Sequence, residues 1–526
     1  MSSNQKVLII GLDGGTWKIL KTMMEKGKMP FLKKLVKEGA SGILKSSIPP
    51  ITAAAWTSFQ TGVNPGKHGI IHFQSFDPVT KQIRLINSDD INAKTIWELA
   101  SERNKKVIAI NVPVTYPPKE VSGIIIGGML SPKVDERFVH PKEIFHRFIK
   151  GQGYQIIGGR LERQASMALE DFIDDQVKIE KKRFDLARKL MKECEWDLFM
   201  VHNQLMDRVQ HAFYPFLDPE SKDYDDEKFE KISKFYEASD MFIAEMAEGA
   251  GKNTAIILLS DHGATRVSCY VNLNAWLLKN GYLKLTYKRL VGNLITLTRK
   301  FDRFGLSKKI VGKFIKSPTL IMKVIGRTSR NLINWENTQA FTINGIIWGN
   351  MHCKEMKLAH QIIEKLKLWK DPVNNKNIIK HIYKKEEIFS GPCLERLPDI
   401  FLEPNEEYAF HAPLIKDMKM FHRVNVINNE RVGTHDLNGI LVIKGNNIKS
   451  NLRIRANIVD MAPTVLAILG LPILEYMDGR VLKEVFIRKP KAKIEEAEVS
   501  DVLESKQYLE KDEKEIEKRL KDLGYL

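Results

Sequence analysis

KVLIIGLDGG, at residues 6–15, decides the fold of this chain. It is a short apolar run that stops at Asp13, as expected of a buried strand whose end meets a polar rim. TAIILLSDHG, at residues 254–263, repeats the pattern, and WDLFMVH, at residues 196–202, is a third run of the same kind. Such runs alternate with helical patterns through residues 1–282. They predict an α/β fold with a mostly parallel central sheet and helices on both faces.

The composition divides the 526 residues into four stretches. Residues 1–282 and 331–487 are predicted to form the two parts of one large α/β core. Residues 283–330 carry Lys and Arg throughout and a single acid, Asp302, and they are predicted to form a basic helical insertion. Residues 488–526 are highly charged and are predicted to form a helical tail, either a peripheral helix or a flexible arm.

The formal net charge of +17 predicts an anionic partner, such as a phosphate ester, nucleic acid or an acidic membrane face. A lysine-rich solvated surface would give the same excess. No specific nucleic-acid motif occurs in the chain. The basic insertion has two interpretations. The functional one is a lid, or a surface that contacts a membrane or an anionic carrier; the more ordinary one is packing on its own domain with a solvated basic face.

Several features favour a cytoplasmic protein. The four cysteines form no CxxC pair and have no regular spacing, which argues against a disulfide framework and a thiolate zinc site. The N-terminal sequence lacks the pattern of a signal peptide. No run approaches the roughly 20 apolar residues of a membrane span. We therefore expect a cytoplasmic location. The alternative is a cytoplasmic protein that contacts the membrane surface through the basic insertion.

Side chains suited to metal binding and nucleophilic attack follow the apolar runs. They are Asp13, Thr52, Asp207, His211, Asp261, His262 and His435. Each alone has an ordinary structural explanation, such as a turn aspartate or a threonine that caps a helix. Together, oxygen and nitrogen donors without cysteine suit Zn²⁺, or alternatively Mn²⁺. Two such ions roughly 4 Å apart can bind the attacking and leaving oxygens of a displacement at phosphorus.

Five motifs that carry these residues occur in a fixed order: GLDGG, PPITAAAWTSFQTG, MDRVQH, SDHGA and GTH. With them the chain resembles the alkaline phosphatase superfamily, and within it the type I phosphodiesterase/nucleotide pyrophosphatase family, over about residues 5–485. The resemblance implies that one metal ion is held by Asp207, His211 and His435. It implies that a second ion is held by Asp13, Asp261, His262 and Thr52. It also implies that Thr52 attacks phosphorus and forms a phosphothreonine intermediate.

The chain departs from the family beside Thr52. Nucleotide-cleaving members have an asparagine and a histidine where this chain has Ala55 and Trp56. The phosphatase branch has an arginine near the nucleophile, and the two alanines after Thr52 offer none. The group that binds the non-bridging phosphate oxygen must therefore come from elsewhere; the candidates are Lys67, His68 and Arg208.

These patterns predict a metal-dependent phosphohydrolase that cleaves phosphodiester or pyrophosphate bonds through Thr52. A phosphomonoesterase or phosphotransferase built on the same site is the first alternative. The non-enzymatic alternative is a protein whose basic surface binds nucleic acid or a membrane, and it explains none of the ordered Asp and His motifs.

Overall fold

The computed structural model describes residues 5–77, 80–157, 167–285, 333–342, 349–411, 419–425, 431–499 and 507–522. The chain divides into two compact units. The first consists of Met1–Arg266, Ile388–Leu397 and Asn425–Tyr525, and the second of Val267–Glu387 and Pro398–Val424.

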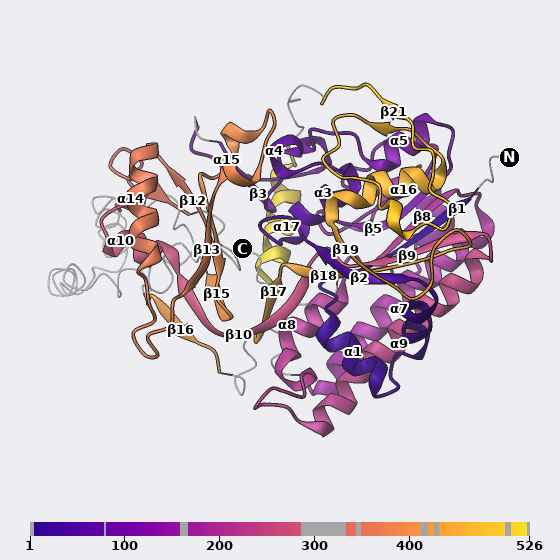
Figure 1. Ribbon diagram of the computed structural model, residues 1–526, viewed down its shortest axis with the longest axis horizontal. Helices are drawn as coiled ribbons and strands as arrows, with labels where there is room; N and C mark the ends of the chain where they lie inside the picture. Colours follow the sequence, from indigo (N-terminus) through magenta and orange to yellow (C-terminus); the bar gives the residue numbers. More distant parts are fainter. Residues whose placement is uncertain are drawn as a thin grey trace, which may run out of the picture. The chain divides into compact units, whose positions relative to one another are not determined.

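A nine-stranded sheet forms the centre of the first unit (Figure 1). In spatial order the strands are β19 (Leu452–Asn457), β2 (Ala40–Lys45), β18 (Asn438–Lys444), β9 (Thr254–Leu259), β1 (Lys6–Leu12), β8 (Leu198–Asn203), β5 (Val107–Val112), β6 (Gly123–Gly127) and β7 (Val139–His140). β1 is parallel to β8 and β9, and β5 is parallel to β8 and β6. β18 is antiparallel to both of its neighbours. The predicted mostly parallel sheet is confirmed.

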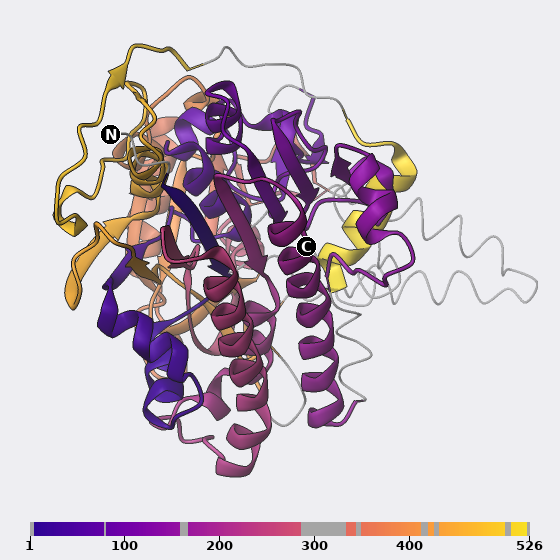
Figure 2. The ribbon, with the colours of Figure 1, turned by 90° about the vertical axis from the view of Figure 1, so that its right-hand side faces the viewer.

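Helices cover both faces of this sheet, as Figures 1 and 2 show. One face carries α1 (Trp17–Glu25), α2 (Pro30–Glu38), α7 (Leu169–Glu193) and α9 (Asp226–Ala250). The other face carries α3 (Thr52–Thr61), α5 (Ile96–Glu102) and α16 (Met461–Leu469). β8 and β9 are buried along their whole length, which is typical of parallel strands covered on both sides. No helix in the described ranges is both long enough and apolar enough to cross a bilayer.

The described end of the predicted tail is a helix, α17 (Glu510–Asp522), that docks on the first unit. Arg519 donates from Nη1 to the carbonyl of Ser131 at 2.6 Å, and Asp512 forms an ion pair with Arg137 at 2.8 Å. Tyr508, just ahead of the helix, donates to the carbonyl of Leu130 at 3.1 Å. Residues 507–522 therefore form a peripheral helix rather than a free arm.

The second unit has its own sheets and its own core. An antiparallel sheet contains β11 (Ala340–Phe341), β12 (Gly349–Cys353), β14 (Ile400–Pro404) and β13 (Ile379–Lys384), in that order. The later part of β10 (Gly263–Asn272) pairs with β15 (Glu407–His411) and β16 (Phe421–Arg423). α10 (Leu273–Lys279) and α14 (Met356–Lys367) contribute apolar residues to a core cluster within this unit.

The predicted division of the chain differs from these units. Residues 331–487 were predicted to belong to one core, whereas residues 331–387 and 398–424 belong to the second unit. An apolar strand pattern predicts a strand but does not identify the sheet that it joins. The predicted basic insertion, residues 283–330, lies almost entirely outside the described residues, which end at 285 and resume at 333.

Candidate active site at one edge of the central sheet

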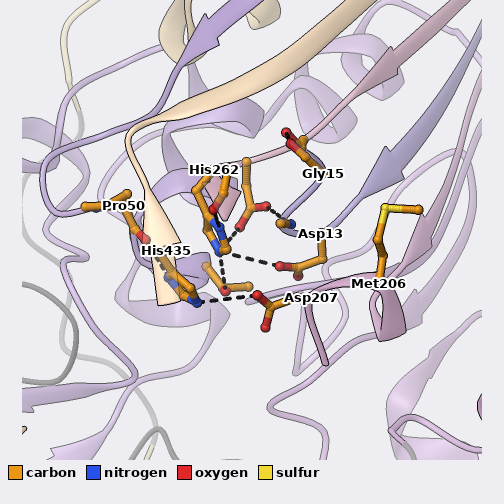
Figure 3. Close-up of polar contacts among 12 residues, drawn as sticks. Asp13, Gly15, Pro50, Met206, Asp207, His262 and His435 are labelled. Carbon is orange, nitrogen blue, oxygen red and sulfur yellow. Dashed lines mark hydrogen bonds and ion pairs between the residues drawn. The ribbon is translucent and has the colours of Figure 1, made fainter. Parts of the chain in front are cut away.

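The direction of the strands brings the predicted site residues to one edge of the sheet. Because β1, β8 and β9 are parallel, the residues that follow them share an edge. β2 runs in the same direction as β9, since both are antiparallel to β18, and the loop after β2 leads into α3. β18 runs the opposite way, so the preceding strand β17 (Gly433–Asp436) reaches the same edge. Figure 3 shows Asp13, Asp207, His262 and His435 turned toward one another there.

Asp207, His211 and His435 form a first cluster of buried donor atoms. Asp207 and His211 lie four residues apart on α8 (Leu205–Leu217), so they share a face of that helix. His211 Nε2 lies 3.1 Å from Asp207 Oδ2 and 3.1 Å from His435 Nε2. His435 Nε2 lies 3.5 Å from Asp207 Oδ1. Three donors from two distant segments therefore surround one point.

Asp13, Asp207 and His262 form a second cluster, so Asp207 belongs to both. His262 Nε2 lies 3.5 Å from Asp13 Oδ1 and 3.3 Å from Asp261 Oδ2. The Thr52 hydroxyl lies 3.4 Å from the same Nε2 atom. The resemblance assigned Asp207 to one ion only and Asp261 to the other. In the structure Asp261 lies beside the second cluster, and Asp207 connects the two.

All three clustered histidines are oriented in the same way. The Nδ1 atoms of His211, His435 and His262 lie 2.7, 2.7 and 2.9 Å from the backbone carbonyls of Gly433, Pro50 and Gly263. A carbonyl only accepts hydrogen bonds, so each Nδ1 carries the proton. Each Nε2 lone pair is then directed into the cluster, which is the arrangement that metal-binding histidines adopt.

The carboxylates of the site are crowded and buried. Burial raises the pKa of Asp13 well above its ordinary value, and the charges of Asp261 and Asp207 act in the same direction. Burial likewise raises the pKa of Asp261 to about 6. Within the described residues, both carboxylate oxygens of Asp13 and Oδ2 of Asp261 are buried without a hydrogen-bond donor. Orphaned carboxylate oxygens beside imidazole lone pairs fit divalent cations such as Zn²⁺ or Mn²⁺.

Burial opposes ionisation of Asp207 too, but the charges of His211 and His435 hold the pKa of Asp207 well below its ordinary value. Burial also lowers the pKa of His435 and of His211. The two histidines lower the pKa of Asp207 only while they carry charge, and each shift by itself favours the deprotonated form of its group. That protonation state is the one in which these groups bind a metal ion.

Thr52 is the first residue of α3, and its side chain is fully buried. Ile51 is the N-cap residue of the helix, so Thr52 lies one position inside it. The explanation of Thr52 as an ordinary helix cap is therefore wrong. Its hydroxyl instead faces His262 at the positive end of the helix dipole, where a phosphate group is stabilised.

Gly14 makes room for this arrangement. Its φ is +69°, and a Cβ atom there would lie 2.9 Å from Asp207 Oδ1 and 3.1 Å from Asp207 Cα. The Gly14 backbone N–H donates to Asp261 Oδ1 at 3.2 Å. The glycine after Asp13 therefore lets the first turn approach α8 closely enough for the clusters to share Asp207.

The three candidates for the phosphate-binding group occupy different settings. Lys67 forms an ion pair with Asp478 at 2.6 Å and donates to the carbonyl of Tyr476 at 2.6 Å. His68 is fully buried, accepts from the backbone N–H of Ile70 through Nδ1, and donates from Nε2 to the Ser58 hydroxyl at 2.9 Å. Both side chains are thus engaged in holding the chain after α3.

Arg208 is buried on α8, one residue after Asp207. On a helix it lies roughly a quarter of a turn away from the face that Asp207 and His211 share. Arg208 is therefore next to Asp207 along the helix, but its side chain leaves the helix from a different face.

The setting of His68 predicts a pH effect on stability. Burial lowers the pKa of His68 to about 3, below that of an exposed histidine, so the folded state loses stability as pH falls through the unfolded pKa. Between pH 7 and pH 5, wild type should lose about 2 kcal/mol of unfolding free energy relative to His68→Gln. Urea titrations at the two pH values measure this difference. A difference that stays constant with pH would contradict the neutral, buried state.

Sequence reasoning missed two residues of the site. His202, at the end of β8, places Nε2 3.1 Å from Asp13 Oδ2, and its ring lies edge-on to Trp56. Arg431, two residues before β17, contacts His211 Nε2 through Nη2. A histidine inside an apolar run and an arginine in a polar loop carry no distinctive pattern. Only the convergence of their segments reveals them.

Comparison with known proteins gives consistent results. The family model for type I phosphodiesterase/nucleotide pyrophosphatase matches residues 7–437. The structure resembles that of phosphonoacetate hydrolase from Sinorhizobium meliloti 1021, with a TM-score of 0.57 and 15% identity over 89% of this chain and 96% of that one. It also resembles human ectonucleotide pyrophosphatase/phosphodiesterase 5, with a TM-score of 0.50 and 14% identity over 92% of this chain and 100% of the other. At such identities the likeness concerns the fold. No curated protein sequence matches the chain.

Proposed function

Because this chain belongs to the type I phosphodiesterase/nucleotide pyrophosphatase family of phosphoester hydrolases, we propose that it cleaves phosphodiester or pyrophosphate bonds through a phosphothreonine intermediate on Thr52. The observation that carries the proposal is the contact between the Thr52 hydroxyl and His262, at the rim of two overlapping Asp/His clusters. Unlike Thr57 of the same helix, whose hydroxyl donates to the Ala53 carbonyl, Thr52 directs its hydroxyl to a side chain of the clusters.

The residues of the chain have distinct roles in this reaction. The Thr52 hydroxyl loses its proton to a water molecule, and its oxygen bonds to phosphorus. The bond from phosphorus to the leaving oxygen breaks, and that oxygen takes up a proton from water. Attack by water then releases the phosphoryl group from Thr52. The N-terminus of α3 favours the negative charge of the phosphate. Two divalent ions, when bound, would offset the three carboxylates and stabilise charge on the attacking and leaving oxygens.

The ligand set supports two ions, one at each cluster, and zinc as the metal. His211 and His435 donate nitrogen to the first cluster and His262 to the second, with carboxylate oxygen from Asp13, Asp207 and Asp261. Mixed imidazole and carboxylate donors suit zinc, with manganese as the alternative. The four cysteines are free, which supports a location in the reducing cytoplasm.

We propose that the enzyme prefers phosphodiesters and does not select for nucleotides among them. Ala55 and Trp56 are fully buried and belong to the core cluster beneath α3, so these positions offer no polar contact for a nucleotide. A phosphomonoesterase or phosphotransferase is the second candidate. It is favoured by the presence of Ala55 and Trp56 where nucleotide-cleaving members of the family have asparagine and histidine. The diester assignment follows the family.

Metal content and ester preference test the proposed function together. We expect wild type to hold about two zinc ions per chain and to hydrolyse bis(p-nitrophenyl) phosphate faster than p-nitrophenyl phosphate. A chelator should abolish the activity, and added zinc should restore it. Elemental analysis and absorbance at the nitrophenolate band provide the measurements. Faster hydrolysis of the monoester would select the phosphomonoesterase candidate, and a metal-free, inactive protein would reject both.

A further inference from the structure

We propose that Arg431 is the side chain that binds a phosphate oxygen of the substrate, in place of the polar group that the helix after Thr52 lacks. This inference rests on the proposed function and deepens it. Arg431 Nη2 contacts His211 Nε2, the atom through which that histidine faces the first cluster. The guanidinium is therefore already at the site.

A short path of contacts connects Arg431 with Thr52. His211 Nε2 lies 3.1 Å from His435 Nε2. The rings of His435 and His262 are stacked with centroids 3.6 Å apart, and His262 Nε2 lies 3.4 Å from the Thr52 hydroxyl. Arg431 and Thr52 are thus linked through three histidines whose Nε2 atoms face the two clusters.

The contact of Arg431 with His211 uses a lone pair that a metal ion would take. A guanidinium only donates hydrogen bonds, so binding of a metal ion to His211 would release this N–H donor toward an acceptor in the site. An anionic oxygen is the acceptor that a guanidinium binds most strongly, through two parallel N–H donors in the favourable case. Arg431 is only partly buried, so a ligand can reach it.

The charges of the site favour the same assignment. The ionised carboxylates of Asp13, Asp207 and Asp261 carry three negative charges. Two divalent ions bound beside them would therefore leave a net charge of +1 at the site. Arg431 would raise this net charge to +2. A phosphodiester gains a second negative charge as its phosphorus is attacked, so the added positive charge stabilises it.

Phosphate binding to the zinc-loaded protein tests the assignment without catalysis. Isothermal titration with inorganic phosphate should show a dissociation constant raised about 10- to 100-fold in Arg431→Gln, and by less in Arg431→Lys. Arg266→Gln is the matched control. Arg266 pairs with Gly433 in the ladder between β10 and β17, but its guanidinium is bound to Asp223 at 2.8 Å, and phosphate affinity should be unchanged.

Zinc content, measured on the same samples, separates the explanations. We expect Arg431→Gln to retain its zinc. Unchanged phosphate affinity in that variant, or loss of its zinc, would overturn the assignment, because Arg431 would then be dispensable or would only support His211. If wild type binds zinc and phosphate in the expected way but hydrolyses neither ester, the proposed function fails while the assignment of Arg431 stands.

Discussion

Thr52→Ala is expected to lower kcat for bis(p-nitrophenyl) phosphate by about 10⁴- to 10⁶-fold, the range that follows removal of a nucleophile. The physical reason is that no other hydroxyl replaces the one that faces His262. Zinc content should be preserved, because the Asp and His donors of both clusters remain. Thr52→Ser should retain measurable activity, since it keeps the hydroxyl.

A covalent adduct provides the second measurement for Thr52. Acid quenching during turnover of the diester should trap p-nitrophenyl phosphate on the peptide that contains Thr52, detectable by mass spectrometry. Thr57→Val is the matched control: Thr57 lies on the same helix, and its hydroxyl donates to the carbonyl of Ala53 at 2.7 Å, so kcat should remain at the wild-type value. Full activity in Thr52→Ala, or an adduct at another residue, would contradict the proposed role.

Glu180→Ala is expected to destabilise the folded chain by about 3–5 kcal/mol, because it leaves a buried charge without its partner. Glu180 and Arg183 are both fully buried on α7, with Oε1 and Nη1 2.5 Å apart. Glu180 Oε1 also accepts the backbone N–H groups of Gln204 and Leu205, each at 3.1 Å. These donors begin α8, so the variant also loosens the helix that carries Asp207 and His211.

Urea unfolding and zinc content measure the two consequences of Glu180→Ala. The double variant Glu180→Leu/Arg183→Met removes both charges and should recover much of the lost stability. Glu227→Gln removes an exposed carboxylate that pairs with Lys231 and should leave unfolding unchanged. A single variant as stable as wild type would show that the buried pair does not hold α8 in place.

The parts of the site that could be predicted are those that a local pattern encodes. Asp13, Asp261 and His262 stand directly after apolar runs, and a buried parallel strand necessarily ends at an edge of its sheet. Asp207 and His211 were paired by helical spacing. The roles of Thr52 and His435 came from the motif order of a family, because a threonine or a histidine in a loop has no pattern of its own.

What could not be predicted depends on which strands become neighbours. Arg431 and Glu180 act on residues that are distant in the sequence, and nothing near either residue indicates its partner. The shared position of Asp207 depends on a glycine with positive φ at the end of another strand. The second unit was not predicted for the same reason, since a strand pattern does not record the sheet to which the strand belongs.

The place of β18 in the sheet has a consequence for the newly made chain. β18 lies between β2 and β9, so until it is added the strand that leads to Thr52 has no ladder joining it to the strand that leads to His262. β18 comes late in translation, after His435, whose ring bonds to the Pro50 carbonyl across 385 residues. Until residues 438–457 are made, β2 has neither of its sheet neighbours, because β19 follows β18 in the chain. The order of synthesis therefore delays assembly of the site until most of the chain exists.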